Sequence, residues 1–246
     1  MFDYATTFAI FYAIFLAGLL KGIVGVGFQT VGIAFLSIIT NLPNAISLLL
    51  IPSLITNLWQ AAAGREFFTI LIRIWPMIVT TCIMVWFGSK ALTRVSLSYL
   101  SAMLGVLLIA YSAFSLLGLR FKVKTKNEWW LSPFMGLING TLTGMTGIFV
   151  VPCVFYFQAI GFRKETLIQS MGVFFTALNL MLIFSLSSKN ILTMELSGWS
   201  AFAIFPAIIG VLVGQLIRKK ISEKIFKNIF FLCLILLGIF IAYNAL

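Results

Sequence analysis

The chain has 246 residues, of which 61% are hydrophobic and 9% are charged, and its formal net charge is +11. Ordinary soluble domains are about 45–50% apolar and about 25% charged, so water is not the solvent for most of this surface. We expect the basic excess to serve membrane orientation and contact with anionic lipid headgroups, not nucleic-acid binding. Histidine is absent from the sequence, so we expect no metal site and no other cofactor.

Apolar segments follow one another along the whole chain, and each is long enough for an α-helix to cross about 30 Å of hydrocarbon. Strands of a β-barrel would alternate polar and apolar residues, so the sequence predicts an all-α polytopic membrane protein. Only Asp3 is charged before the first segment, so we expect that segment to stay as a helix and not to be removed as a signal peptide. The segments are 7–40, 44–62, 70–88, 97–118, 129–160, 166–186, 197–217 and 225–246.

Two of these segments, 7–40 and 129–160, are too long for one crossing, and each is interrupted by glycines. The runs are GLLKGIVGVG, from Gly18 to Gly27, and GLINGTLTGMTG, from Gly136 to Gly147. Glycine weakens a helix and admits positive φ. We therefore predict that each segment unwinds there and turns back as a hairpin, with short arms of about fifteen residues that meet inside the membrane.

The basic loop residues favour two hairpins over two single crossings. Single crossings divide the loop cations nine against seven, whereas hairpins divide them thirteen against three, as the positive-inside rule requires. We predict an integral protein of a bacterial-type inner (cell) membrane, with both termini outside and the basic loops cytoplasmic. The thirteen are Arg65, Arg73, Arg120, Lys122, Lys124, Lys126, Arg163, Lys164, Arg218, Lys219, Lys220, Lys224 and Lys227, and the three are Lys90, Arg94 and Lys189.

The two halves of the chain are similar, and the predicted topology turns the second upside down. GSKALTRVS (88–96) and GQLIRKKIS (214–222) each introduce the last span of a half, and Asn57 and Asn179 each lie thirteen residues into the span after a hairpin. Chance similarity among Leu-rich helices is the alternative. We predict two inverted repeats in one membrane domain, 1–119 and 129–246, joined by a basic cytoplasmic linker at 120–128, with the site at their interface.

The two glycine segments carry a family resemblance. KGIVGVGFQTVG (21–32) and NGTLTGMTGIFVVP (139–152) resemble the sulfite exporter TauE/SafE family of membrane anion transporters. The second half keeps a proline five residues after Gly147, whereas the first half has Gly32 at that place, and neither half has adjacent glycines. The resemblance implies transport, in the export direction, of a sulfur-containing or related organic anion such as sulfite, thiosulfate or a sulfonate.

Lys21 is the most informative charged residue, because it lies inside the first glycine run with no acidic residue in a nearby span. A lysine in hydrocarbon needs a partner or a water-filled cavity. That partner could be a carbonyl at the unwound turn, a lipid phosphate or a bound anion. Alternatively, Lys21 extends from the hairpin tip to the cytoplasmic headgroups.

The helix ends at the two breaks offer further groups for an anion. An arm that begins inside the membrane directs unpaired N–H groups and the positive end of its dipole at the break. Helix packing and interhelical hydrogen bonds are the alternative role for the polar residues, including Gln60 and Gln169. The candidate binding residues are Lys21, Gly22, Gly25, Gly27, Gln29, Thr30 and Asn57 in the first half, with Asn139, Thr141, Thr143, Thr146, Gly147 and Asn179 in the second.

These features predict a secondary transporter or facilitator for a small anion. The alternative is a membrane-embedded binding or scaffold subunit that does not transport. An intramembrane enzyme is disfavoured, because all five glutamates fall in or beside loops and no carboxylate pair remains for catalysis. The expected partners are the anion and the lipid bilayer, and the sequence is compatible with a homodimer.

Overall fold

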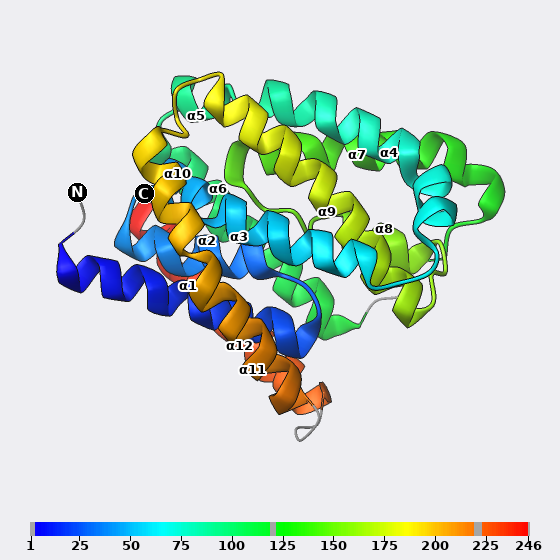
Figure 1. Cartoon of the computed structure of the whole chain (residues 1–246). Coiled ribbons are helices and arrows are strands. Elements are labelled where there is room, and N and C mark those ends of the chain that lie inside the picture. Colours follow the sequence, from blue (N-terminus) through cyan, green and yellow to red (C-terminus); the bar gives the residue numbers. More distant parts are fainter. Residues whose placement is uncertain (1–2, 119–121, 219–222, 246) are drawn as a thin grey trace.

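The computed structural model describes residues 3–118, 122–218 and 223–245, and all regular structure in these ranges is helical (Figure 1). Arg120, Lys219 and Lys220, counted among the basic loop residues, lie outside the described residues. The helices are α1 (Tyr4–Val24), α2 (Phe28–Ile39), α3 (Leu42–Ala62), α4 (Phe67–Gly88), α5 (Ala91–Arg94), α6 (Leu97–Leu117), η1 (Thr125–Asn127), α7 (Glu128–Thr146), α8 (Cys153–Ala159), α9 (Lys164–Ser187), α10 (Met194–Phe202), α11 (Ile204–Arg218) and α12 (Glu223–Ala245).

Six stretches of helix among the described residues have the length and apolar composition that a membrane crossing needs. They lie in α1, α3, α4 with α5, α6, α9, and α10 with α11. The all-helical membrane class predicted from composition is confirmed. Short polar side chains begin several of these helices, as at α1, where Asp3 accepts a hydrogen bond from the Thr6 amide at 3.0 Å.

Both long segments are broken, but each break lies at the C-terminal edge of its glycine run. In the first half, Gly25 and Gly27 have φ of 90° and 93° and separate α1 from α2. In the second half, Gly147 has a φ of 74°, and residues 147–152 separate α7 from α8. The predicted equal arms of about fifteen residues are wrong: α1 and α2 have 21 and 12 residues, and α7 and α8 have 19 and 7.

The arms are unequal because the other glycines of each run stay helical and allow another helix to approach closely. A Cβ atom added at Gly22 would lie 2.9 Å from the Cα of Gly214 on α11, and one added at Gly18 would overlap the carbonyl oxygen of Ala207. Small residues at this spacing let helix backbones pack in contact in membranes. These glycines therefore join α1 to α11 and do not unwind α1.

The same arrangement recurs in the second half, where α7 packs on α4. A Cβ atom at Gly144 would lie 2.7 Å from the carbonyl oxygen of Val85, and one at Gly140 would overlap the carbonyl oxygen of Thr81. The first helix of each half thus contacts the other half, and α3 packs on α9 while α6 packs on α12 (Figure 1). The two halves are interlocked along the whole bundle.

The predicted segment 197–217 is divided into α10 and α11, which the sequence interpretation did not foresee. The division falls at Ala203. Pro206 has no N–H to bond the carbonyl of Phe202, so the helix is interrupted there, and proline is tolerated in the first turn of the helix that follows.

The loops collect at two opposite ends of the bundle. At one end, the amide of Val123 donates to the carbonyl of Ala159 at 2.9 Å, and the Thr166 hydroxyl donates to Glu66 at 2.9 Å. The loop after α9 lies beside the end of α4, because the Lys189 ammonium lies 4.3 Å from the ring centroid of Trp86. Both chain ends point toward one end of the bundle (Figure 1). Which end faces the cytoplasm stays a prediction.

The pKa of Lys189 is lowered by its surroundings. Its ammonium donates to the Ser185 hydroxyl at 2.7 Å and to the Ser185 carbonyl at 3.2 Å. Partial burial lowers the pKa of Lys189, and the positive charge of Lys90 lowers it further. Two cations from the loops after α4 and α9 therefore lie close enough to repel each other.

Candidate anion-binding site

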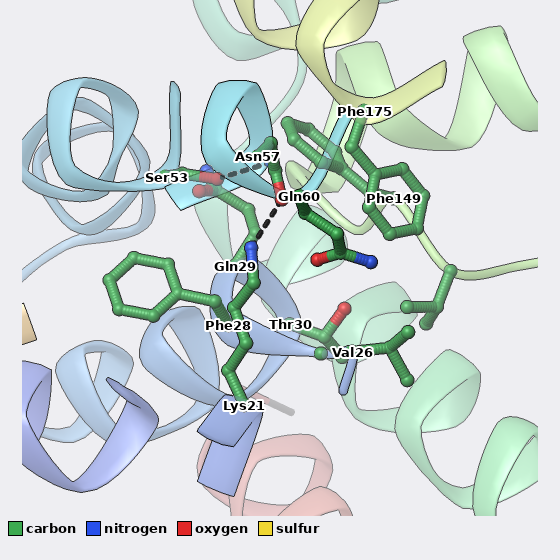
Figure 2. Close-up of a pocket in the computed structure, with 12 residues that line it drawn as sticks. Lys21, Val26, Phe28, Gln29, Thr30, Ser53, Asn57, Gln60, Phe149 and Phe175 are labelled. Atoms are coloured by element: carbon green, nitrogen blue, oxygen red, sulfur yellow. Dashed lines mark hydrogen bonds between the residues drawn. The ribbon is translucent and has the colours of Figure 1, made fainter. Parts of the chain in front are cut away.

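Lys21 lies one turn before the end of α1 and is only 6% exposed. Its ammonium donates to the amide oxygen of Asn57 (Figure 2) and to the Thr56 hydroxyl at 3.1 Å, both on α3. Within residues 3–118, 122–218 and 223–245, no carboxylate pairs with it. The ammonium points into the bundle, so extension to the headgroups does not describe this side chain. A buried cation with only neutral partners leaves a desolvation cost of several kcal/mol largely uncompensated.

A chain of hydrogen bonds continues from Lys21 across α3 to α9. Asn57 donates its amide to the Ser53 hydroxyl oxygen at 3.2 Å, and Asn179 donates to the same oxygen at 3.1 Å. The two asparagines noted for their matching places in the two halves therefore meet at Ser53. The amide oxygen of Asn179 has no hydrogen-bond partner among the described residues.

The N-terminus of α2 contributes a second set of polar groups. Gly27 begins this helix without a side-chain cap, so the first backbone N–H groups of α2 have no intrahelical acceptor. Gln29 and Thr30 are 3% and 1% exposed, and neither side chain has a hydrogen-bond partner in the described part of the chain. Each unsatisfied buried polar group costs about 1–3 kcal/mol, and a bound anion or water at this positive helix end would relieve that cost.

A small cavity of about 10 Å³ lies between these elements (Figure 2), with room for about one water molecule. Its polar lining is Lys21, Gln29, Thr30, Ser53, Asn57 and Gln60, whereas Thr56 and Asn179 do not line it. The first break lines it from Val26 to Thr30, and the second break lines it through Phe149 and Val150. The rings of Phe149 and Phe175 lie 5.6 Å apart and close one side. The two helix breaks therefore meet at this cavity, and the second contributes apolar side chains.

A sequence model described as sulfite exporter TauE/SafE matches residues 10–241, which include both breaks and all the residues that line the small cavity. The chain belongs to the TauE/SafE family. Its members are transporters, so this protein is a membrane transporter and not an enzyme. No curated protein and no solved structure matches the chain.

In this TauE/SafE chain, three polar candidates of the second half form hydrogen bonds to backbone groups in or beside the second break. They are Asn139, Thr143 and Thr146. Asn139 donates to the carbonyls of Phe149 at 3.0 Å and Val151 at 2.6 Å, and Thr143 donates to the carbonyl of Ile148 at 2.7 Å. The Thr146 hydroxyl donates to Leu142 at 2.7 Å and accepts from the Ile148 amide at 3.3 Å. These side chains satisfy the unwound backbone of residues 147–152 and do not line the cavity.

Two further candidates of the second half are also away from the cavity. Thr141 donates to the carbonyl of Leu137 within its own helix. A Cβ atom at Gly147 would lie 2.6 Å from Ile33 and 2.8 Å from Ile46, so this glycine allows close contact with α2 and α3. In the first half, Gly22 and Gly25 line a larger neighbouring cavity together with Lys21.

Several residues at the site were not predicted from the sequence. Ser53 lies one turn before Asn57 on the same face of α3, and that spacing could have identified it. Nothing in the sequence singled out Phe149 or Phe175 from the other phenylalanines. Gln60 donates to the carbonyl of Ile168 at 2.6 Å and Gln169 donates to that of Ala61 at 2.9 Å, which confirms the interhelical bonds suggested for these two glutamines.

The hydrogen bonds of Asn139 lead to a prediction about the second break. Asn139→Ala leaves the buried carbonyl of Phe149 and the half-buried carbonyl of Val151 without their donor, so we expect the free energy of unfolding to fall by about 1–3 kcal/mol. Thr141→Ala, on the same helix, loses only a bond within α7 and serves as the matched control. Thermal unfolding in detergent measures both; equal stability of the two variants would contradict this role for Asn139.

Proposed function

We propose that this protein is a secondary transporter or facilitator that exports a small sulfur-containing anion, such as sulfite, thiosulfate or a sulfonate. Membership of the TauE/SafE family supports the substrate class. The single observation that carries the proposal is the buried Lys21, which is bonded to neutral oxygens and has no carboxylate partner among the described residues. A cation held in this way is available to an anion.

The groups around Lys21 suit an oxyanion. Thr56 and Asn57 hold the ammonium through single hydrogen bonds to neutral oxygens, and an anion adds an attraction between full opposite charges that these oxygens lack. An arriving anion can therefore displace them. The amide of Gln29, the hydroxyl of Thr30 and the first N–H groups of α2 would then replace water around its oxygens.

The cavity of about 10 Å³ is too small for an anion of four or more heavy atoms, so transport requires it to widen. The backbone at Gly25–Gly27 and at residues 147–152 is the part of the bundle around the cavity that is not helical. Such a movement requires large changes of φ and ψ at only a few residues. We propose that the two breaks move apart to admit the anion.

The interlocked halves support the proposed inverted repeats, residues 1–119 and 129–246. α1 packs on α11 as α7 packs on α4, and Asn57 and Asn179 reach one serine. Transporters built this way bind substrate between the repeats. We propose that the end with the 122–127 and 160–163 loops faces the cytoplasm, since basic residues there outnumber those at the other end.

Flux into proteoliposomes tests this function. We expect saturable uptake of radiolabelled sulfite or thiosulfate, inhibited by unlabelled sulfonates and not by sodium or potassium at equal ionic strength. Chloride uptake measures unselective leak. Absence of flux for every anion in correctly folded protein would overturn the transporter proposal and favour the binding or scaffold subunit.

A further inference from the structure

A second, larger cavity lies next to the Lys21 site. It has a volume of about 530 Å³, is partly open, and is lined by α1, α3, α9 and α11. Arg218, at the last turn of α11, and Ala63, which follows α3, line it at the end where the basic loops collect. We call this cavity the vestibule. Its lining consists of Lys21, Gly22, Gly25, Thr56, Trp59, Gln60, Ala63, Ile168, Ile208, Val211, Leu212, Gln215 and Arg218.

The described charges of the vestibule have one sign. Among the residues that the structure describes, Lys21 and Arg218 line it and no acidic residue does. A cleft with charges of one sign and low-dielectric walls concentrates ions of the opposite sign and speeds their association. The vestibule is therefore suited to collect anions from the end of the bundle that carries the basic loops.

The vestibule and the small cavity are adjacent and share lining residues. Lys21 and Gln60 are the two residues that line both. Gln60 bridges α3 and α9 through its 2.6 Å bond to the carbonyl of Ile168, and Ile168 itself lines the vestibule. Figure 2 shows the Gln60 amide directed into the same space as the Lys21 ammonium and Thr30.

We infer that the vestibule is the passage by which an anion reaches Lys21, and that Gln60 forms a gate with Lys21 between the vestibule and the small cavity; this inference rests on the proposed function. Opening the gate breaks the Gln60–Ile168 and Lys21–Asn57 hydrogen bonds. Both the amide N–H₂ of Gln60 and the ammonium of Lys21 are then free to donate to the passing anion. Gln60 thus selects anions in addition to holding α3 against α9.

Three variants separate a gate from a simple interhelical bond. Gln60→Met and Gln169→Met each remove one glutamine bond between α3 and α9, and Gln169 lines neither cavity. Gln169→Met also removes the bond that the Gln169 amide oxygen accepts from the Glu66 amide at 3.1 Å, so the flux of each variant is compared with its own loss of thermal stability. Gln60→Glu also removes the amide donor and adds a negative charge between the two cavities. A negative charge there repels the passing anion, so we expect sulfite flux through Gln60→Glu to be at least about tenfold below that of Gln60→Met.

The flux comparison has a defined contrary result. If Gln60 only holds α3 against α9, then flux falls together with thermal stability in both Gln60→Met and Gln169→Met. Gln60→Glu then transports as well as Gln60→Met. That result would overturn the gate. All three variants are compared at equal protein incorporation, with thermal unfolding in detergent as the check that each is folded.

Labelling of one cysteine tests the passage without requiring transport. Ile208→Cys lines the vestibule, whereas the neighbouring Ile209 is 54% exposed on the outer surface and serves as the matched position. Cys82 and Cys233 are first replaced by alanine, while the buried Cys153 is kept. We expect an anionic methanethiosulfonate reagent to modify Ile208→Cys about tenfold faster than a cationic one, and neither to modify Ile209→Cys in lipid.

The ratio of the labelling rate with the anionic reagent to that with the cationic reagent at Ile208→Cys should fall when Lys21→Met is added. No labelling at this position, or equal rates with both reagents, would overturn the passage. Charge-selective labelling without flux of any anion would leave the passage standing and would overturn the proposed transport function.

Discussion

Lys21→Met is expected to lower sulfite flux by about 10- to 100-fold. A hydrogen bond to a charged group contributes about 1.5–3 kcal/mol, and about 1.4 kcal/mol corresponds to a factor of ten. Methionine has nearly the length of lysine and fills the same space. Because it removes a buried cation that has no ionic partner among the described residues, we expect thermal stability to stay equal or to rise.

The control for this variant is Lys122→Met, which removes the same charge from an exposed position before η1. Proteoliposome flux and thermal unfolding are measured on both. Equal flux through the two variants would show that Lys21 does not contact the anion. A large fall in thermal stability of Lys21→Met would instead assign Lys21 a structural role through Thr56 and Asn57.

A large loss of stability is also expected where α1 and α11 pack. A Cβ atom at Gly210 would overlap the carbonyl oxygen of Phe15 and lie 2.8 Å from the amide of Leu19, and backbone atoms cannot rotate out of the way. Gly210→Ala therefore pushes the two helices apart, and we expect a loss of about 1–3 kcal/mol in the free energy of unfolding.

Gly198→Ala is the matched substitution, since nothing lies within 4 Å of a Cβ atom at that position in α10. Alanine favours a helix over glycine by up to about 1 kcal/mol, so this variant should be as stable as the parent or more stable. Thermal unfolding of both variants in one detergent measures the difference. A Gly210→Ala variant as stable as Gly198→Ala would show that the α1–α11 contact tolerates a side chain.

Much of the fold follows from the sequence because membrane helices are set by local composition. The predicted segment 44–62 became α3 (Leu42–Ala62), and 97–118 became α6 (Leu97–Leu117). The breaks were also predicted, because positive φ at Gly25, Gly27 and Gly147 is what glycine permits. The arm lengths were wrong because a glycine in a helix and a glycine at a turn look alike in a sequence, and only the neighbouring helix distinguishes them.

The site was predicted unevenly for a similar reason. Lys21 lies just before the first break, and Gln29 and Thr30 lie just after it, so their proximity follows from the sequence alone. Asn139 and Thr143 were expected to face an anion, but they bond backbone carbonyls of the second break. Phe149 and Gln60 reach the cavity through the packing of helices distant in sequence, which no local pattern predicts.

Locating a bound anion tests the central claim most directly. We would determine a crystal structure with bromomethanesulfonate, whose bromine gives an anomalous signal. The account predicts a sulfonate oxygen within hydrogen-bond distance of the Lys21 ammonium, with the two helix breaks further apart than in the structure described above. A bromine peak elsewhere in the bundle, with Lys21 still bonded to Asn57, would contradict it.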